Sequence, residues 1–174
     1  TVKIDNPQLT TRLEGKKGIN PKRIILDANL SIPEDAKVLH NEFPSDTIII
    51  TGNSASPEQK NLIEKTGAQL IEVKTADNLI DLNELMDRLG QMRITSLLIE
   101  GGSRVAAEAL KSGIVDKICF FYAPKILGGD DGTPMLRGEG PDLMSQCIQL
   151  KDVAIQRFDD DFMIEGYIHV HRHH

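Results

Sequence analysis

The sequence contains glycine pairs that follow apolar runs, and such pairs can bind anions through their main chain. The segment Leu97–Ser103 (LLIEGGS) leads from such a run through Gly101 and Gly102 into an Ala-rich stretch. A strand that ends in glycines at a helix start exposes backbone N–H groups to an anion, so the segment predicts a phosphate-binding turn. The pattern is not G-x-G-x-x-G, and a tight strand-to-helix turn without a ligand is the simpler alternative.

Two carboxylates stand where predicted strands end. Glu100 follows Leu97–Ile99, and Asp27 follows the run Arg23–Leu26. In open α/β sheets the carboxyl ends of the strands border the crevice that binds ligands, where acids bind polyol hydroxyls or transfer protons. The alternatives are structural, with Glu100 as the partner of a helix dipole and Asp27 as a turn or N-cap residue.

Two further segments carry groups that bind small ligands. Lys125 and the pair Gly128-Gly129 follow another apolar run, and residues 1–12 (TVKIDNPQLTTR) combine an Asn-Pro turn with hydroxyls and a guanidinium suited to a sugar phosphate. A surface loop and a plain turn are the respective alternatives. The histidines and the two cysteines form no triad, disulfide or zinc pattern, so no metal is expected.

The elements that must position these residues alternate between strands and helices. Short apolar runs predict strands at 23–26, 47–50, 69–73, 94–99 and 118–122, and capping signals with helical spacing predict helices at 56–67, 82–90 and 104–111. This alternation predicts a mostly parallel sheet flanked by helices, so the fold class is α/β. Segments 149–157 and 162–169, across Asp159–Asp161, predict an antiparallel C-terminal hairpin that finishes the sheet.

Composition limits the domain count and the partners. The chain has 174 residues, 40% of them hydrophobic, with no internal repeat or linker, which predicts one domain over residues 1–170. A net charge of -6 without Arg/Lys runs argues against nucleic acid as a partner. The lack of a long apolar stretch or signal-peptide pattern predicts a cytoplasmic protein with no membrane partner. Thr1 in place of methionine suggests a truncation, and residues 171–174 (HRHH) are a candidate tag remnant.

Several of these segments together resemble one family. The motifs are TVKIDNPQLTTR at 1–12, IILD at 24–27, LSIPEDAKV at 30–38, LLIEGGS at 97–103, GIVDKI at 113–118 and APKILGG at 123–129. In order and spacing they resemble the reductase domain of bacterial bifunctional riboflavin-biosynthesis deaminase/reductases. No single motif is decisive, but the series covers nearly the whole chain.

The resemblance implies a dihydrofolate-reductase-like fold, NADPH as cofactor, and reduction of the ribosyl side chain of 5-amino-6-(5-phosphoribosylamino)uracil to the ribityl form. Two alternatives stay open. One is reduction of 2,5-diamino-6-ribosylamino-pyrimidinone 5′-phosphate, and the other is a catalytically silent domain that dimerises or binds a nucleotide. The resemblance also implies a homodimer or higher homo-oligomer.

Residue by residue, the resemblance assigns roles to positions in the matching motifs. Asp27 and Glu100 are the expected catalytic acids near the reacting ribose. The expected substrate-binding residues are Thr1, Asp5, Asn6, Arg12 and Lys125, with Arg12 on the 5′-phosphate. The expected cofactor-binding residues are Thr51, Gly52, Asn53 and Ser54 on the adenosine side, and Gly101, Gly102, Ser103, Arg104 and Val105 at the pyrophosphate.

The sequence departs from the family pattern at its start. Family members have a further strand and helix before the Thr1 motif, and a zinc deaminase domain often precedes the reductase domain. The P-C-x-x-C part of the deaminase pattern is absent here, so this chain is not expected to deaminate.

Overall fold

The computed structural model describes residues 2–13, 15, 18–40, 42–129 and 131–168. The chain divides into two compact units, Thr1–Thr95 and Ser96–His174. The single domain expected over residues 1–170 stays a prediction, and the candidate tag at 171–174 lies outside the described residues. No helix in the described ranges is long and apolar enough to cross a membrane.

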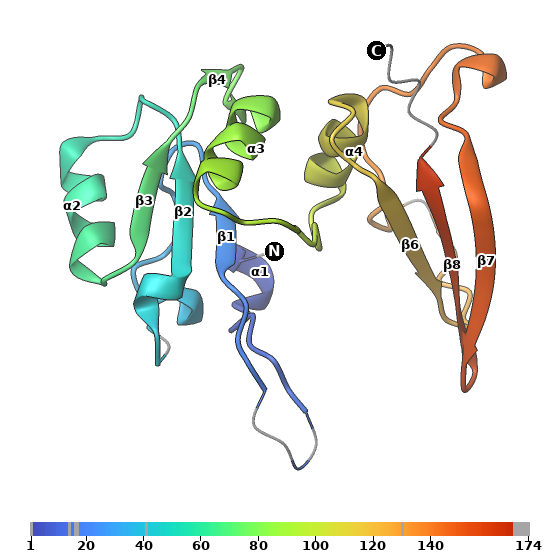
Figure 1. Ribbon diagram of the computed structural model, residues 1–174, viewed down its shortest axis with the longest axis horizontal. Helices are drawn as coiled ribbons and strands as arrows, with labels where there is room; N and C mark the ends of the chain where they lie inside the picture. The colour runs from blue at the N-terminus through green and yellow to red at the C-terminus, as the bar shows by residue number, and fades with distance from the viewer. Residues whose placement is uncertain (1, 14, 16–17, 41, 130, 169–174) are drawn as a thin grey trace. The chain divides into compact units, whose positions relative to one another are not determined.

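The first unit is built on a parallel sheet in the order β1-β2-β3 (Figure 1). Its strands are β1 (Arg23–Leu26), β2 (Thr47–Thr51) and β3 (Gln69–Glu72), as the apolar runs predict. Every residue of the central strand β2 is buried, and Ile48, Ile49 and Ile50 have no exposed surface. A parallel strand that is covered on both faces has no solvent side, which is why its sequence lacks polar alternation.

Helices follow the strands where the capping signals predict them. α2 (Pro57–Lys65) begins after Ser56, whose side chain forms a reciprocal capping box with Gln59, and it lies beside β3 (Figure 1). α3 (Leu82–Gln91) runs one residue past the predicted stop and buries a face made of Leu82, Leu85 and Leu89. The helices predicted at 56–67 and 82–90 are therefore confirmed, and α2 is the crossover between the parallel strands β2 and β3.

Several short elements leave no clear pattern in the sequence. They are the helix α1 (Val2–Asp5), the 3-10 turns η1 (Lys37–Leu39) and η2 (Pro44–Asp46), and the hairpin of β4 (Thr75–Ala76) with β5 (Leu79–Ile80). Asp77 and Asn78 turn this hairpin with φ values of 50° and 61°. Positive φ at both central residues is typical of a type I′ turn.

The predicted strand at 94–99 is wrong, because residues 94–100 form neither strand nor helix. Arg93 has a φ of 60°, and the Ile94 N–H donates to the Leu89 carbonyl at 3.0 Å, so the end of α3 holds the start of this run. Leu98 is 81% exposed. A strand needs a hydrogen-bonding neighbour, and apolar composition alone does not supply one.

The second unit combines α4 (Ser103–Lys111) with an antiparallel sheet in the order β6-β8-β7. Its strands are β6 (Lys117–Tyr122), β7 (Leu150–Phe158) and β8 (Asp161–Ile168), with the turn η3 (Met144–Gln146) before β7. The predicted C-terminal hairpin is confirmed, with Asp159 and Asp160 between its strands. The strand pattern predicts that the strand at 118–122 belongs to the parallel sheet. That placement is wrong, because β6 pairs with β8 in the antiparallel sheet.

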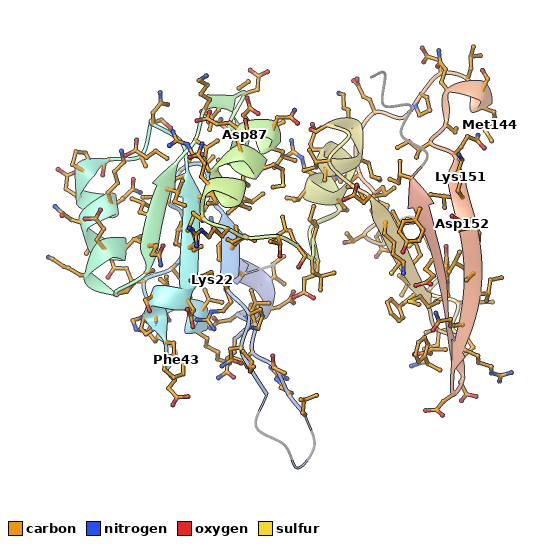
Figure 2. All side chains as sticks on the ribbon, viewed as in Figure 1. Lys22, Phe43, Asp87, Met144, Lys151 and Asp152 are labelled. Atoms are coloured by element: carbon orange, nitrogen blue, oxygen red, sulfur yellow. The ribbon has the colours of Figure 1, made fainter. Side chains whose placement is uncertain are left out.

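The antiparallel sheet has one irregular strand and one cross-strand ion pair. β7 shifts register between Lys151 and Ala154, where Asp152 has a φ of 49° (Figure 2). Lys117 Nζ lies 2.7 Å from the Glu165 carboxylate on the paired strand. The hydrogen bond with Glu165 raises the pKa of Lys117.

A buried guanidinium ties the starts of β1 and β2 to the chain between them. Arg23 is only 3% exposed, and it donates from Nε to Thr47 Oγ1 at 3.0 Å and from Nη2 to the Phe43 carbonyl at 2.7 Å. Thr47 Oγ1 in turn donates to the Val38 carbonyl at 2.8 Å. Burial lowers the pKa of Arg23, and the Asp46 carboxylate opposes that shift. Phe43 lies at the end of the sheet where β2 begins (Figure 2).

Candidate functional site

The carboxyl ends of β1 and β2 lie side by side and carry Asp27 and Thr51-Gly52. The Asp27 N–H donates to the Ile50 carbonyl at 2.9 Å, and the Gly52 N–H donates to the Ala28 carbonyl at 2.9 Å. Thr51 Oγ1 donates to the same Ala28 carbonyl at 3.2 Å. A residue predicted to be a catalytic acid and a segment predicted to bind cofactor are therefore neighbours, at the edge where open α/β sheets bind ligands.

The Asp27 carboxylate organises a turn of its own chain, residues 27–32. Its Oδ1 accepts a hydrogen bond from Ser31 Oγ at 2.9 Å, and its Oδ2 accepts one from the Ile32 N–H at 2.6 Å. The Leu30 N–H donates to the Asp27 carbonyl at 3.1 Å, and Leu30 has a φ of 48° with a buried side chain. Asp27 is thus a turn residue, as the structural alternative holds. Each carboxylate oxygen keeps a further lone pair for a ligand.

Asn6 contacts the loop that follows β1 at Lys37, beyond the Asp27 turn. It has a φ of 41°, and its Oδ1 accepts a hydrogen bond from the Lys37 N–H at 2.9 Å. Leu9, three positions along, packs against the core cluster that contains Leu30. Asp27 therefore holds the start of the loop after β1, and Asn6 contacts the same loop further along, at Lys37.

The other residues of the first segment that are predicted to bind substrate are Thr1, Asp5 and Arg12. Asp5 and Arg12 are exposed, and Arg12 lies before the stretch 18–20 that returns to β1. Thr11 holds that return through hydrogen bonds with Asn20 and the Ile19 carbonyl. Thr1 lies outside the described residues. The assignment of Arg12 to a phosphate stays a prediction.

Packing at the edge of the sheet requires glycine at position 52. A Cβ added there would lie 2.7 Å from Thr75 Cγ2 and 3.1 Å from the Ala28 carbonyl oxygen. Asn53 and Ser54 follow in an exposed turn before the buried Ala55. Gly52 thus has a structural reason of its own, while Asn53 and Ser54 are accessible to a ligand.

Gly52→Ala is expected to lower the free energy of unfolding by about 1–2 kcal/mol, because the added methyl group must displace Thr75 or the Ala28 main chain. Gly90→Ala is the matched control, since its Cβ would meet no atom within 4 Å inside α3. We expect this control to stabilise the protein by about 0.5–1 kcal/mol. Urea unfolding measures both, and equal effects would contradict the packing argument.

The predicted pyrophosphate turn lies in the second unit, at the start of α4. Gly101 and Gly102 have φ values of 69° and 80°, which favour glycine. No side chain caps α4, so the first helical N–H groups, of Ser103, Arg104 and Val105, have no side-chain acceptor at the cap. A glycine turn before an uncapped helix is the backbone arrangement that binds phosphate groups.

Glu100 and Lys125 also belong to the second unit. Glu100 is exposed and lies in the stretch 94–100, so its expected position at the end of a central strand is wrong. Its catalytic role stays a prediction. Lys125 is exposed after β6, and the following Gly128 and Gly129 have φ values of 70° and 76°.

The part of the chain that the structure describes contains no group of three or more His, Cys, Asp or Glu side chains that would hold a metal ion. Residues 40–42 do spell H-x-E, although without P-C-x-x-C. The His40 ring contacts the Glu34 carbonyl, which gives this histidine a local structural role.

The parallel sheet with its helices and the C-terminal antiparallel hairpin confirm the predicted α/β class. The chain belongs to the family described as RibD C-terminal domain, whose model matches residues 1–164. The family predicted from the serial motifs is therefore confirmed.

Named relatives define the family further. The chain is 32% identical over 165 residues to the riboflavin biosynthesis protein RibD of Actinobacillus pleuropneumoniae, covering 95% of this chain and 43% of that protein. It is 34% identical over 166 residues to the 2,5-diamino-6-ribosylamino-4(3H)-pyrimidinone 5′-phosphate reductase of Methanothermobacter thermautotrophicus, covering 95% and 74%. The structure of Acinetobacter baumannii RibD matches with a TM-score of 0.77 and 25% identity, over 97% of this chain and 44% of that one. The chain thus spans less than half of the RibD proteins, and its relatives include named reductases.

Proposed function

We propose that this chain catalyses a reduction in riboflavin biosynthesis, in which NADPH reduces the ribosyl side chain of 5-amino-6-(5-phosphoribosylamino)uracil to the ribityl form. The observation that carries the proposal is the Asp27 turn at the carboxyl edge of β1, beside Thr51-Gly52, in a chain of the RibD C-terminal domain family. A fixed carboxylate at this edge suits a substrate rich in hydroxyl groups.

The chain's residues fit a nicotinamide dinucleotide, the cofactor class that a reductase family implies. The uncapped start of α4 after Gly101-Gly102 suits the pyrophosphate, and the exposed Arg104 adds a positive charge there. Thr51–Ser54 are assigned to the adenosine side. When bound, NADPH supplies the hydride for C1′ of the ring-opened sugar.

The chain's own side chains carry the remaining tasks. An ionised Asp27 only accepts hydrogen bonds, so it binds a ribose hydroxyl and orients the sugar. Glu100 is assigned to proton exchange near the reacting carbon. The substrate is held by Thr1, Asp5, Asn6 and Lys125. The planar guanidinium of Arg12 binds its 5′-phosphate. Holding the reacting groups in place supplies much of the rate enhancement.

A second candidate substrate is 2,5-diamino-6-ribosylamino-4(3H)-pyrimidinone 5′-phosphate. The match to the Methanothermobacter thermautotrophicus reductase favours it, since this chain covers 74% of that enzyme. The two substrates differ at the pyrimidine ring and share the ribosyl phosphate. Parallel assays with each substrate, in which the loss of NADPH absorbance measures turnover, distinguish the two reactions.

The test of the proposed function is NADPH titration followed by turnover. We expect saturable fluorescence changes with NADPH, and NADPH oxidation only when a phosphoribosylaminopyrimidine is added. Binding without turnover of either substrate would instead support a silent nucleotide-binding domain. Absence of NADPH binding would contradict the proposal. Light scattering on the same sample tests the expected homodimer or higher homo-oligomer.

A further inference from the structure

We infer that Ser31 is a positioning residue for the candidate site: its hydroxyl, together with the Ile32 N–H, sets the orientation in which Asp27 accepts hydrogen bonds from substrate hydroxyls. The inference rests on the proposed function and adds a residue to which neither the motifs nor the family match assigns a role. The turn at residues 27–32 and the Gln59 side chain that contacts it lie within the first unit.

The Asp27 carboxylate accepts hydrogen bonds from two donors of its own turn. Rotation about the terminal bond of an aspartate is broad, so the side chain alone does not set the plane of its oxygens. Here a different donor binds each oxygen, Ser31 Oγ at 2.9 Å and the Ile32 N–H at 2.6 Å. Two donors at opposite oxygens fix that plane, and loss of either one frees it.

The turn that carries Ser31 is held in place at Leu30. Leu30 has a φ of 48°, which is strained for a leucine, and its side chain is 5% exposed within the core cluster. The Leu30 N–H is bonded to the Asp27 carbonyl, and the Gln59 side chain donates to the Leu30 carbonyl at 3.5 Å. Strained residues persist where their surroundings over-determine them, and they gather at functional sites.

Asp27 and Ser31 keep hydrogen-bond acceptors that a ligand can use. Ser31 is an exposed residue, and its single hydroxyl hydrogen is used on Asp27. The Ser31 oxygen can still accept hydrogen bonds, as can both carboxylate oxygens. Asp27 and Ser31 together therefore present a row of acceptors, which suits a ligand with adjacent hydroxyl groups such as an open-chain sugar.

The experiment compares Ser31→Ala and Ser31→Thr with the parent chain in NADPH turnover and in amide hydrogen exchange at Ile32. We expect Ser31→Ala to lower kcat/KM by on the order of tenfold, because a small misplacement of an orienting group is costly. Ile32 exchange is expected to accelerate in Ser31→Ala. Ser31→Thr keeps a hydroxyl and is expected to restore both values.

Thr66→Val is the control, because it removes a hydroxyl at the opposite end of α2 that donates to the Ile63 carbonyl and accepts from the Ala68 N–H. It is expected to lower stability with unchanged kcat/KM. Unchanged Ile32 exchange and kcat/KM in Ser31→Ala would overturn the inference, as would equal losses of kcat/KM in Ser31→Ala and Thr66→Val. If the parent chain lacks turnover, the proposed function fails, and Ile32 exchange alone decides whether Ser31 fixes Asp27.

Discussion

Asp27→Asn is expected to reduce kcat/KM by about a hundredfold while changing the free energy of unfolding by less than about 1 kcal/mol. Under the proposed function, the variant loses the negative charge and one of the acceptor atoms that bind the substrate sugar. Steady-state NADPH oxidation measures the first effect. Urea unfolding measures the second.

The fold is expected to survive because an asparagine can keep both hydrogen bonds of the Asp27 turn. Its Oδ1 accepts from the Ile32 N–H, and its amide donates to Ser31 Oγ, whose hydroxyl reverses direction. Asp27→Ala is the contrasting variant, since it removes both bonds and is expected to lose about 1–2 kcal/mol. Full turnover by Asp27→Asn would remove Asp27 from the catalytic assignment.

Thr47→Val is expected to lower the free energy of unfolding by about 3 kcal/mol, the largest stability loss expected of a single substitution here. Thr47 is fully buried, and its hydroxyl accepts from Arg23 Nε and donates to the Val38 carbonyl. Valine has nearly the same shape, so the loss comes from the hydrogen bonds rather than from a cavity. The buried guanidinium makes the loss larger than that of a neutral pair.

Thr11→Val is the control for this experiment, because the Thr11 hydroxyl also donates to a main-chain carbonyl, that of Ile19, but on the surface. Water replaces the lost partner there, so we expect a change under about 1 kcal/mol. Thermal or urea unfolding of both variants gives the comparison. Similar losses at the two positions would show that Arg23 does not depend on Thr47.

Local signals explain what the sequence predicts correctly in the fold. The strand at Thr47–Thr51 is an unbroken β-branched run, and α2 carries its capping box in Ser56 and Gln59. The run at 94–99 has the same composition as a buried strand, yet it forms none in the described backbone. Strand formation depends on a partner that is distant in sequence, and no periodicity encodes that partner.

In the candidate site, too, some features follow from the strand pattern and others do not. Asp27 and Thr51-Gly52 become neighbours because adjacent parallel strands end at the same edge, which the strand pattern predicts. Ser31 could not be predicted from periodicity, because a side chain that closes a turn on its own loop leaves no repeating pattern. A serine four positions after a strand-end aspartate is the signal that was available.

The register shift in β7 affects how a strand of another molecule could add to this edge of the sheet. β7 lies at the edge of its sheet and exposes Val153, Ile155 and Phe158, a composition that invites another strand to add by hydrogen bonding. The register shift between Lys151 and Ala154, with Asp152 at positive φ, bends the ladder that such an added strand must follow. Charged residues at a kinked edge are a known protection against aggregation. The bend at Asp152 therefore disfavours the addition of a flat strand at this edge of the sheet.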